Sequence, residues 1–468
     1  MSRKNDLAKN TVILAIGRIS TQFINFLLLP LYTSLLLPEE YGIIDLFNTY
    51  VILLVPLFNL QFDTGLFRFL IDYRNDEKTK TELFSTVINS NVIQSLIYIV
   101  FYIIFSRFIN LDFKIFLAID VVLTIFLNTL LQYVRGIGDN KKYSIGSFVC
   151  ATLIVILNVV FIAVLKTGAL GMFVSTTISK IVTILFMIIS CKVWKNYSFK
   201  SANINTFKKL SKYSIPLIPN QLSWWVIGAS DRTIISTILN IAKNGIYSVA
   251  NKFSSIFISF FNIFNLSWTE SVSLHIKDRD KDIFIYDTIN QMYSFFSSIC
   301  FCIIGFMPFV FNILVDKKYI LAYNQIPILM IAVLFQVIVG LYSTVYVAHK
   351  KSVEIAKTSI FSAIINIVVN LLLIKKFGLY AASLSTLVSY SSMAIYRYFD
   401  IKKYVKAPLS KHNLILSILI GIMLMFSYYN NILILNIISL CIVLIYTFVI
   451  NKDMINYVFK YIKNTIRR

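Results

Sequence analysis

The chain is a succession of apolar stretches of roughly 20–30 residues separated by short polar segments, and about 20 apolar residues suffice for a helix to span a bilayer. It is 57% hydrophobic and only 14% charged, with a mean hydropathy of +0.75, whereas a soluble chain is typically about a quarter charged. Transmembrane β-strands would alternate over about ten residues, and residues 93–105 form a continuous apolar run. The sequence therefore predicts an all-α polytopic membrane protein.

The apolar stretches predict about 14 transmembrane helices. They are expected at residues 11–36, 42–70, 83–106, 113–134, 143–165, 169–191, 214–239, 245–274, 284–314, 324–347, 354–374, 379–398, 413–429 and 432–450. No connecting segment exceeds about twenty residues, so we expect no soluble domain on either side of the membrane.

Lys and Arg residues gather in alternate loops. If the N-terminus is cytoplasmic, the inward segments hold 31 of the 44 Lys and Arg residues and the outward loops hold 8. Short loops rich in Lys and Arg stay in the cytoplasm, so we expect both termini there. The net charge of +22 then reflects membrane topology, and no nucleic-acid partner is predicted.

The chain contains an internal duplication of a six-span unit. Short motifs of the first half recur at an offset that drifts from 203 to 210, as when Gly42 and Asn48 recur as Gly245 and Asn251. We therefore predict two pseudo-symmetric six-helix lobes related by an axis along the membrane normal. The predicted divisions are an N-lobe at 1–195, a cytoplasmic amphipathic linker at 196–213, a C-lobe at 214–403, two extra helices at 412–450 and a basic tail at 451–468.

Five basic side chains lie inside predicted spans: Arg18, Arg68, Lys180, Arg232 and Lys252. One such residue facing lipid at mid-membrane costs about 2.5–3.5 kcal/mol. Five would cost on the order of 12–17 kcal/mol, as much as the whole stability of a typical domain. We therefore expect them to line a protein-enclosed cavity suited to an anionic substrate.

Some of these cations have a structural alternative. Arg68 lies near the inner end of its span and Lys180 has a long stem, so either could extend its charge to the interface. Asp231 and Arg232 are adjacent, so on a helix they point about 100° apart and cannot simply neutralise each other. Pairing with neighbours in the next span is the alternative for these two residues.

Acidic residues also fall inside the spans. Asp63, Asp231 and Glu270 are expected to pair with the cations or to titrate as ion-coupling groups. Asp45 and Asp120 lie near the outer ends of their spans, where we expect them to be solvated. The three histidines are far apart, and neither a metal site nor a catalytic residue is predicted.

Two groups of motifs carry a family likeness. Residues 9–11, 30–33 and 38–42 read KNT, PLYT and PEEYG, and residues 230–235 and 244–253 read SDRTII and NGIYSVANKF. They resemble the corresponding parts of bacterial oligosaccharide flippases of the Wzx type, and the likeness covers essentially the whole chain. It implies the fold of the multidrug/oligosaccharidyl-lipid/polysaccharide (MOP) exporter superfamily, with two six-helix lobes around a central cavity. The extra helix pair is similar to that of lipid II flippases, whose last two helices form a groove for the lipid tail.

The resemblance also implies a function. Such proteins move undecaprenyl-pyrophosphate-linked sugar units from the inner to the outer leaflet of the bacterial cytoplasmic membrane, for capsule, O-antigen or exopolysaccharide assembly. Arg18, Arg232 and Lys252 would receive the diphosphate, and Asn48, Asn251, Trp224 and Trp225 would contact sugar. The implied partners are the lipid-linked oligosaccharide, membrane lipids, and polymerase and assembly proteins. No cofactor is implied beyond a coupling ion, Na⁺ or H⁺.

Two other functions compete with this one. A multidrug exporter of the same superfamily would handle amphipathic cations, for which acidic rather than basic cavity residues are expected. A membrane polysaccharide polymerase would need catalytic groups in sizeable outward loops, and every outward loop here is short. The sequence therefore favours a transporter over an enzyme.

Overall fold

The structure is a computed structural model that describes residues 26–108, 111–276, 278–349, 351–405, 409–452 and 454–456. Across these ranges the regular elements are helices, without a β-strand, which confirms the all-α class. The chain divides into two compact units, residues 1–248 (unit 1) and 249–468 (unit 2). The division falls inside α11 (Ile241–His275), whose first turns belong to unit 1.

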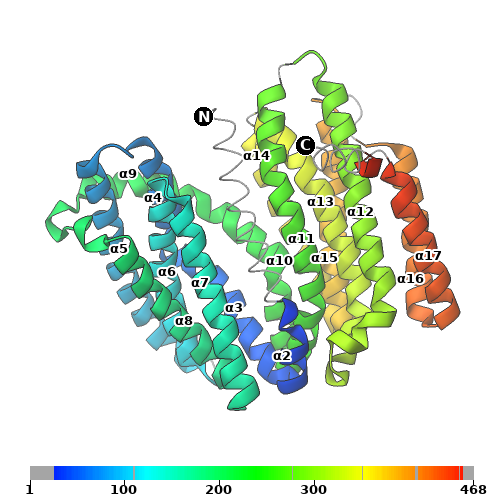
Figure 1. Ribbon diagram of the computed structural model, residues 1–468, viewed down its shortest axis with the longest axis horizontal. Coiled ribbons are helices and arrows are strands. Elements are labelled where there is room, and N and C mark those ends of the chain that lie inside the picture. The colour runs from blue at the N-terminus through cyan, green and yellow to red at the C-terminus, as the bar shows by residue number, and fades with distance from the viewer. Residues whose placement is uncertain are drawn as a thin grey trace, which may run out of the picture. The chain divides into compact units, whose positions relative to one another are not determined.

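In unit 1 the long helices α5 to α8 stand side by side, and α9 lies against α4 and α5 (Figure 1). Tyr32 near the chain start accepts a 2.7 Å hydrogen bond from Asn158 at the end of α7. The helices of this unit before α11 are α2 (Leu29–Leu35), α3 (Pro38–Phe58), α4 (Phe62–Asp72), α5 (Glu77–Phe105), α6 (Lys114–Gly136), α7 (Asn140–Asn158), a π-helical turn (Val159–Val164), α8 (Gly168–Ser190), α9 (Ile204–Ser214) and α10 (Ile218–Ile238).

Helix α5 is apolar outside and polar inside. Ile93 and Leu96 on its outer face are 59% and 58% exposed, whereas Asn91, Gln94 and Ser95 on its inner face are buried. This is the reverse of a surface helix in a soluble protein, whose apolar face turns to the core. The pattern requires an apolar solvent around the helix.

Unit 2 consists of α12 (Lys281–Leu314), α13 (Ile326–Ala348), α14 (Ser352–Phe377), α15 (Leu379–Ile401), α16 (Lys411–Asn430) and α17 (Leu433–Ile450), after the rest of α11. The final pair, α16 and α17, packs on α12. Small polar groups join them: the Ser297 hydroxyl lies 2.9 Å from the Tyr446 hydroxyl, and the Asn451 amide donates to Ser298 Oγ at 2.9 Å. In hydrocarbon such interhelical hydrogen bonds and small residues hold helices together.

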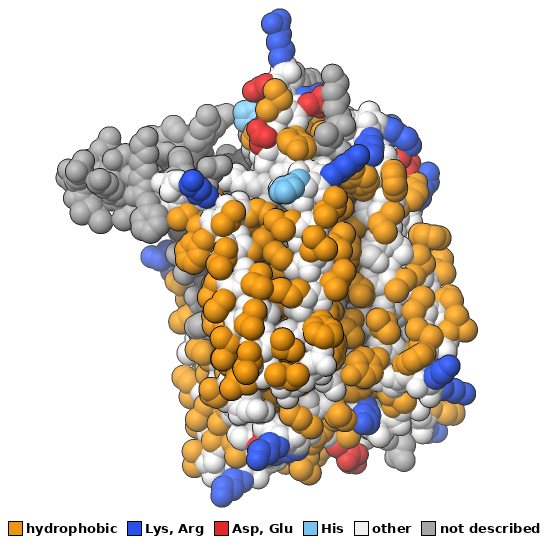
Figure 2. All heavy atoms as spheres, turned by 90° about the vertical axis from the view of Figure 1, so that its right-hand side faces the viewer, with side chains coloured by type: hydrophobic (Ala, Val, Ile, Leu, Met, Phe, Trp, Pro, Cys, Tyr) orange, Lys and Arg blue, Asp and Glu red, His pale blue; other side chains and the backbone are white. Residues whose placement is uncertain are grey.

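The surface fits a membrane setting. Figure 2 shows a broad band of apolar side chains, with Lys and Arg gathered towards its two ends. On α16 and α17, Ile422, Phe426, Ile434, Ile445 and Phe448 are each more than 60% exposed. Within the described ranges, ten helices are long and apolar enough to cross a membrane.

The predicted spans need one correction. The expected span at 42–70 is two helices, because Leu60 and Gln61 are in the left-handed region (φ 52° and 58°) between α3 and α4. The spans expected at 214–239, 245–274 and 379–398 are present as the long helices α10, α11 and α15, which are too polar to count among the ten. Most of the first expected span, residues 11–25, lies outside the described residues.

A fully buried arginine joins three helices of unit 2. Arg397 on α15 is 0% exposed. Its guanidinium donates to Thr358 Oγ1 of α14 at 2.7 Å and to the Val339 carbonyl of α13 at 3.1 Å, and it also bonds Ser343 Oγ. The structure buries Arg397 among neutral oxygens, which satisfy its donors without a carboxylate.

We predict that Arg397→Met destabilises unit 2 by about 1–3 kcal/mol, because the carbonyl and hydroxyl groups around the guanidinium lose a donor while still buried. Thermal unfolding of the purified protein in detergent would measure it. Lys403→Met is the matched control, since Lys403 is 71% exposed and pairs only locally with Asp400. Equal unfolding temperatures for the two variants would contradict the structural role of Arg397.

Candidate functional site

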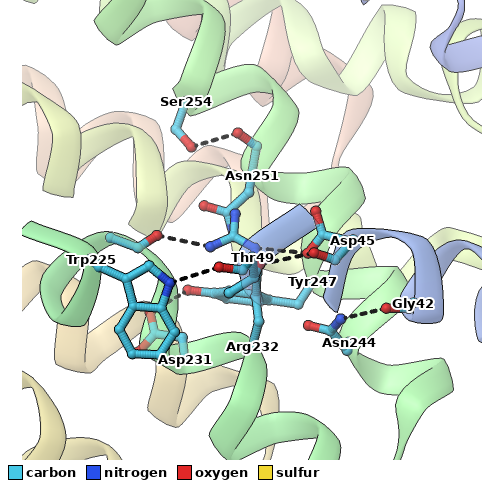
Figure 3. A network of polar contacts seen from close by, with 11 residues as sticks. Gly42, Asp45, Thr49, Trp225, Asp231, Arg232, Asn244, Tyr247, Asn251 and Ser254 are labelled. Carbon is cyan, nitrogen blue, oxygen red and sulfur yellow. Dashed lines mark hydrogen bonds and ion pairs between the residues drawn. The ribbon is translucent and has the colours of Figure 1, made fainter. Parts of the chain in front are cut away.

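A buried ion pair joins α10 to α3. Arg232 Nε on α10 lies 2.7 Å from Asp45 Oδ2 on α3, and these side chains are only 13% and 17% exposed. A second guanidinium nitrogen donates to the Gly228 carbonyl one turn earlier, at 2.8 Å. Figure 3 shows the guanidinium directed at Asp45. We expected Asp45 to be solvated; it is instead largely buried as the ion-pair partner of Arg232.

Asp231, next to Arg232, has a different partner. It is 2% exposed, and Tyr247 on the first turns of α11 donates its hydroxyl to Asp231 Oδ2 at 2.9 Å. The two adjacent side chains thus contact different helices, in agreement with their separation of about 100° around α10. Two carboxylates, one guanidinium and one phenol form this polar cluster of unit 1: Asp45, Asp231, Arg232 and Tyr247 (Figure 3).

Two glycines bring the backbones of α3 and α11 together beside this cluster. A Cβ on Gly42 would overlap the Ile241 carbonyl oxygen, and a Cβ on Gly245 would overlap the Pro38 carbonyl oxygen. The contact is reciprocal, because residues 38 and 42 stand at the same offset of 203 from residues 241 and 245. Asn244 adds a 2.9 Å hydrogen bond to the Gly42 carbonyl.

Capping groups and one interhelical hydrogen bond hold α3 and α10 in position. Pro38 occupies the first turn of α3, where its missing N–H costs nothing, and the Glu40 carboxylate accepts from the Leu37 amide at 2.8 Å and from the Ala169 amide of α8 at 3.1 Å. On the other side, Trp225 of α10 donates its indole N–H to the Thr49 carbonyl of α3 at 2.8 Å. These bonds fix the two helices that carry Asp45 and Arg232.

The second intramembrane ion pair is separate from the first. Lys180 Nζ on α8 lies 2.5 Å from Asp120 Oδ1 and 2.8 Å from Thr124 Oγ1, both on α6. We expected Asp120, like Asp45, to be solvated. It is instead only 14% exposed and forms an ion pair with Lys180. The structure therefore does not bring Lys180 together with Arg232.

The remaining predicted site residues are scattered. Arg68 is exposed on α4 and pairs with Asp72 at 2.8 Å, one turn on, and Asn48 is exposed on α3. Asp63 is partly buried on the first turn of α4 and forms no ion pair with another described residue. The other four are placed as follows: Asn251 and Lys252 are partly buried on α11 in unit 2, Arg18 lies outside the described residues, and so does the side chain of Glu270.

Sequence reasoning missed the acidic partners and the role of Trp225 in holding α3. Asp45 and Asp120 could have been found, since each is a carboxylate inside a stretch that is otherwise apolar. Trp225, Asn244 and Tyr247 gave no such signal, because polar aromatic and amide residues are common near membrane boundaries.

A group of buried polar side chains lies on α5 and at the end of α3, where Asn59 comes directly before the break between α3 and α4. We call Asn59, Asn91, Gln94 and Ser95 the amide cluster. The Asn91 amide nitrogen donates to Thr129 Oγ1 at 2.8 Å, and that of Gln94 to the Asn59 carbonyl at 3.4 Å. Five other atoms of the cluster are buried and have no hydrogen-bond partner among the described residues: both side-chain ends of Asn59, the amide oxygens of Asn91 and Gln94, and the Ser95 hydroxyl. At about 1–3 kcal/mol per unsatisfied group, the total approaches the stability of a domain.

Unit 2 has an apolar groove with a volume of about 510 Å³. Its walls come from α12, α13, α15 and α16, so the extra helix pair contributes one side. The groove is lined chiefly by Phe301, Leu334, Phe335, Ile338, Ile395, Leu414, Ile418, Ile422 and Met425, with the polar Tyr293 and Ser417 beside them.

The sequence matches one family. A family model described as "Polysaccharide biosynthesis protein" matches residues 7–268, more than half of the chain. The chain belongs to this family. No match was found among curated proteins.

Several solved structures with a similar fold are described as transporters or as a flippase. The lipid II flippase MurJ in an inward closed conformation is similar with a TM-score of 0.70 at 16% identity, over 96% of this chain and 100% of that one. An inward-facing multidrug resistance MATE transporter of the MOP superfamily gives 0.65 at 14% identity, over 82% and 96%. A MOP transporter from Pyrococcus furiosus, described as having a binding pocket of reverse polarity, gives 0.54 at 15% identity, over 84% and 96%. The fold is thus that of the MOP superfamily, as the motifs predicted, and this family member is a multi-pass membrane protein.

We predict that Gly245→Ala lowers the stability of unit 1 by about 1–3 kcal/mol, because the new methyl group meets a rigid backbone carbonyl of α3. Thermal unfolding of the purified chain would measure the loss. Gly228→Ala in α10 is the matched control, since a Cβ there has no atom within 4 Å, and it should be neutral or slightly stabilising. If both variants unfold at the wild-type temperature, α3 and α11 do not pack through these glycines.

Proposed function

We propose that this protein is a flippase that moves undecaprenyl-pyrophosphate-linked oligosaccharide units from the inner to the outer leaflet of the bacterial cytoplasmic membrane by alternating access. Capsule, O-antigen or exopolysaccharide assembly would consume the product. The family, described as polysaccharide biosynthesis, and the fold, shared with transporters and flippases, support this proposal over an enzymatic role. A polysaccharide polymerase and assembly proteins are its expected partners.

The observation that carries the proposal is the enclosed Arg232–Asp45 pair within a member of this family. A diphosphate must lose water to cross about 30 Å of hydrocarbon, and it needs charged donors in exchange. A guanidinium offers forked, charge-assisted hydrogen bonds that match phosphate oxygens. In this structure a carboxylate of the same protein occupies the place of the anion. Substrate would therefore compete with Asp45 for Arg232.

The apolar groove in unit 2 supports a lipid-linked substrate. Its lining is almost wholly aliphatic and aromatic, and one wall belongs to α16 of the extra helix pair. A polyprenyl tail is a hydrocarbon chain without polar groups, so part of it could bind in such an apolar groove. The tail would remain outside the polar path taken by the sugars.

A multidrug exporter is the second candidate, and one feature favours it. Counted by formal charge, the polar cluster of unit 1 holds two carboxylates, Asp45 and Asp231, against one guanidinium. A site with excess negative charge suits an amphipathic cation. The experiment that tests the flippase therefore includes export of a cationic dye as a second readout.

We predict that Arg232→Gln lowers flipping of a lipid-linked oligosaccharide about 10- to 100-fold, the loss expected for hydrogen bonds of about 1.5–3 kcal/mol to a charged group. The measurement is the outer-leaflet appearance of labelled lipid-linked oligosaccharide in proteoliposomes. Arg68→Gln is the matched control, because Arg68 is exposed and pairs only with Asp72. Full flipping by Arg232→Gln, or dye export with no flipping by the wild type, would refute the proposal.

The competition between Asp45 and substrate has its own test. Asp45→Asn removes the charge that neutralises Arg232, so the variant should bind inorganic pyrophosphate or a lipid diphosphate more tightly than the wild type. Titration of the purified protein would show it. Weaker binding in Asp45→Asn would mean that Asp45 positions Arg232 rather than competes with substrate.

We also propose that both termini are cytoplasmic, on the distribution of Lys and Arg among the loops. A reporter active only outside the cytoplasm should then be active when fused after residue 167 and inactive after residue 196. The opposite pattern would reverse the orientation.

A further inference from the structure

The break between α3 and α4 is strained and does not lie at a glycine. Leu60 and Gln61 both have left-handed backbone angles, φ 52° and 58°. Residues with side chains rarely adopt this conformation, and it persists where the surroundings hold it in place. The break therefore needs interactions that fix it.

The amide cluster faces this break. Asn91, Gln94 and Ser95 occupy positions i, i+3 and i+4 of α5 and so share one face. Gln94 contacts the break directly through its 3.4 Å hydrogen bond to the Asn59 carbonyl. Asn91, on the same face of α5, donates a hydrogen bond to Thr129 of α6. All four cluster side chains are more than nine-tenths buried.

The hydrogen bonds already made show what kind of partner is missing. The amide nitrogens of Asn91 and Gln94 donate to protein acceptors, whereas their oxygens have no donor within the part of the chain that the structure describes. The Ser95 oxygen and the Asn59 amide also have no partner among the described residues, and an Asn amide can present its oxygen. The cluster thus offers up to four uncharged oxygens to something electropositive.

We propose that the amide cluster binds a monovalent metal cation, with sodium as the ion to test first. Hard cations take oxygen ligands, and divalent ions such as Ca²⁺ and Mg²⁺ rely on carboxylates that the cluster itself lacks. Rings of uncharged oxygens serve monovalent ions in selectivity filters, and broken membrane helices supply ion ligands in transporters. Bound here, the ion would join the α3–α4 break to α5 and, through Thr129, to α6. This inference does not depend on the proposed substrate.

The test is thermal unfolding of the purified full-length protein in detergent as sodium chloride replaces choline chloride at constant ionic strength. A ligand bound only by the folded state raises the unfolding temperature as its concentration passes the dissociation constant. We expect a sodium-dependent, saturable rise, and binding of about one radioactive sodium ion per chain. A series with potassium chloride shows which monovalent ion the cluster prefers.

Ser95→Ala and Gln94→Met each remove one ligand oxygen. Both should raise the sodium concentration at half-effect at least tenfold. Ser90→Ala is the matched control: Ser90 is buried on the same helix, but its hydroxyl already bonds the Thr86 carbonyl at 2.7 Å, so its sodium response should equal that of the wild type. Ser95→Ala is the smaller change, so the sodium response can still be measured with this variant if Gln94→Met does not fold.

Two results would overturn the proposal. If unfolding temperatures are the same in sodium, potassium and choline, water rather than a metal cation satisfies these oxygens. If both variants keep the wild-type response, a cation binds elsewhere. Because binding is measured without substrate, neither result bears on the flippase assignment.

Discussion

A charged side chain within a bilayer is stable only when the protein itself supplies its counter-charge or its hydrogen-bond partners. Three basic residues show how this chain meets that condition. Arg232 takes a carboxylate from α3, Lys180 takes one from α6, and Arg397 takes neutral oxygens from α13 and α14. Each bond set joins different helices, so the charges that make the chain costly to insert also hold helices together.

The surroundings of Arg397 and Arg232 differ in how easily each guanidinium could exchange its partners. Arg397 is fully buried and held by several neutral groups, which suits a permanent structural contact. Arg232 keeps some exposure and is neutralised by a single carboxylate of another helix. A cation held by one competitor can change partners when another anion arrives, whereas a cation enclosed by many oxygens cannot. This contrast supports the proposed role of Arg232 in transport and a structural role for Arg397.

Much of the fold could be predicted from the sequence, because span length and the distribution of charge are local properties. The apolar stretches at 83–106 and 113–134 are close to the observed α5 and α6, and the motifs around Gly42 and Arg232 led to the correct superfamily. The helical spacing of Asp231 and Arg232 also predicted that these adjacent charges would not simply neutralise each other, and the structure gives Arg232 the carboxylate of Asp45 instead.

The partners themselves could not be predicted. Asp45 lies 187 residues before Arg232, and proximity to a span end gave the wrong expectation for it and for Asp120. The α3–α4 break was missed because neither glycine nor proline stands at Leu60 or Gln61, so local propensity gave no signal. Both failures have the same cause, since contacts made only after folding determined the outcome.

The reciprocal approach of Gly42 and Gly245 has an evolutionary meaning. In a two-fold homodimer, a residue i that touches j on the partner is matched by j touching i. Here residues 38 and 42 meet residues 241 and 245 in that pattern, although all four belong to one polypeptide. This is the contact pattern expected of the duplication that the sequence motifs predict, with both copies of one self-complementary patch carried by a single polypeptide.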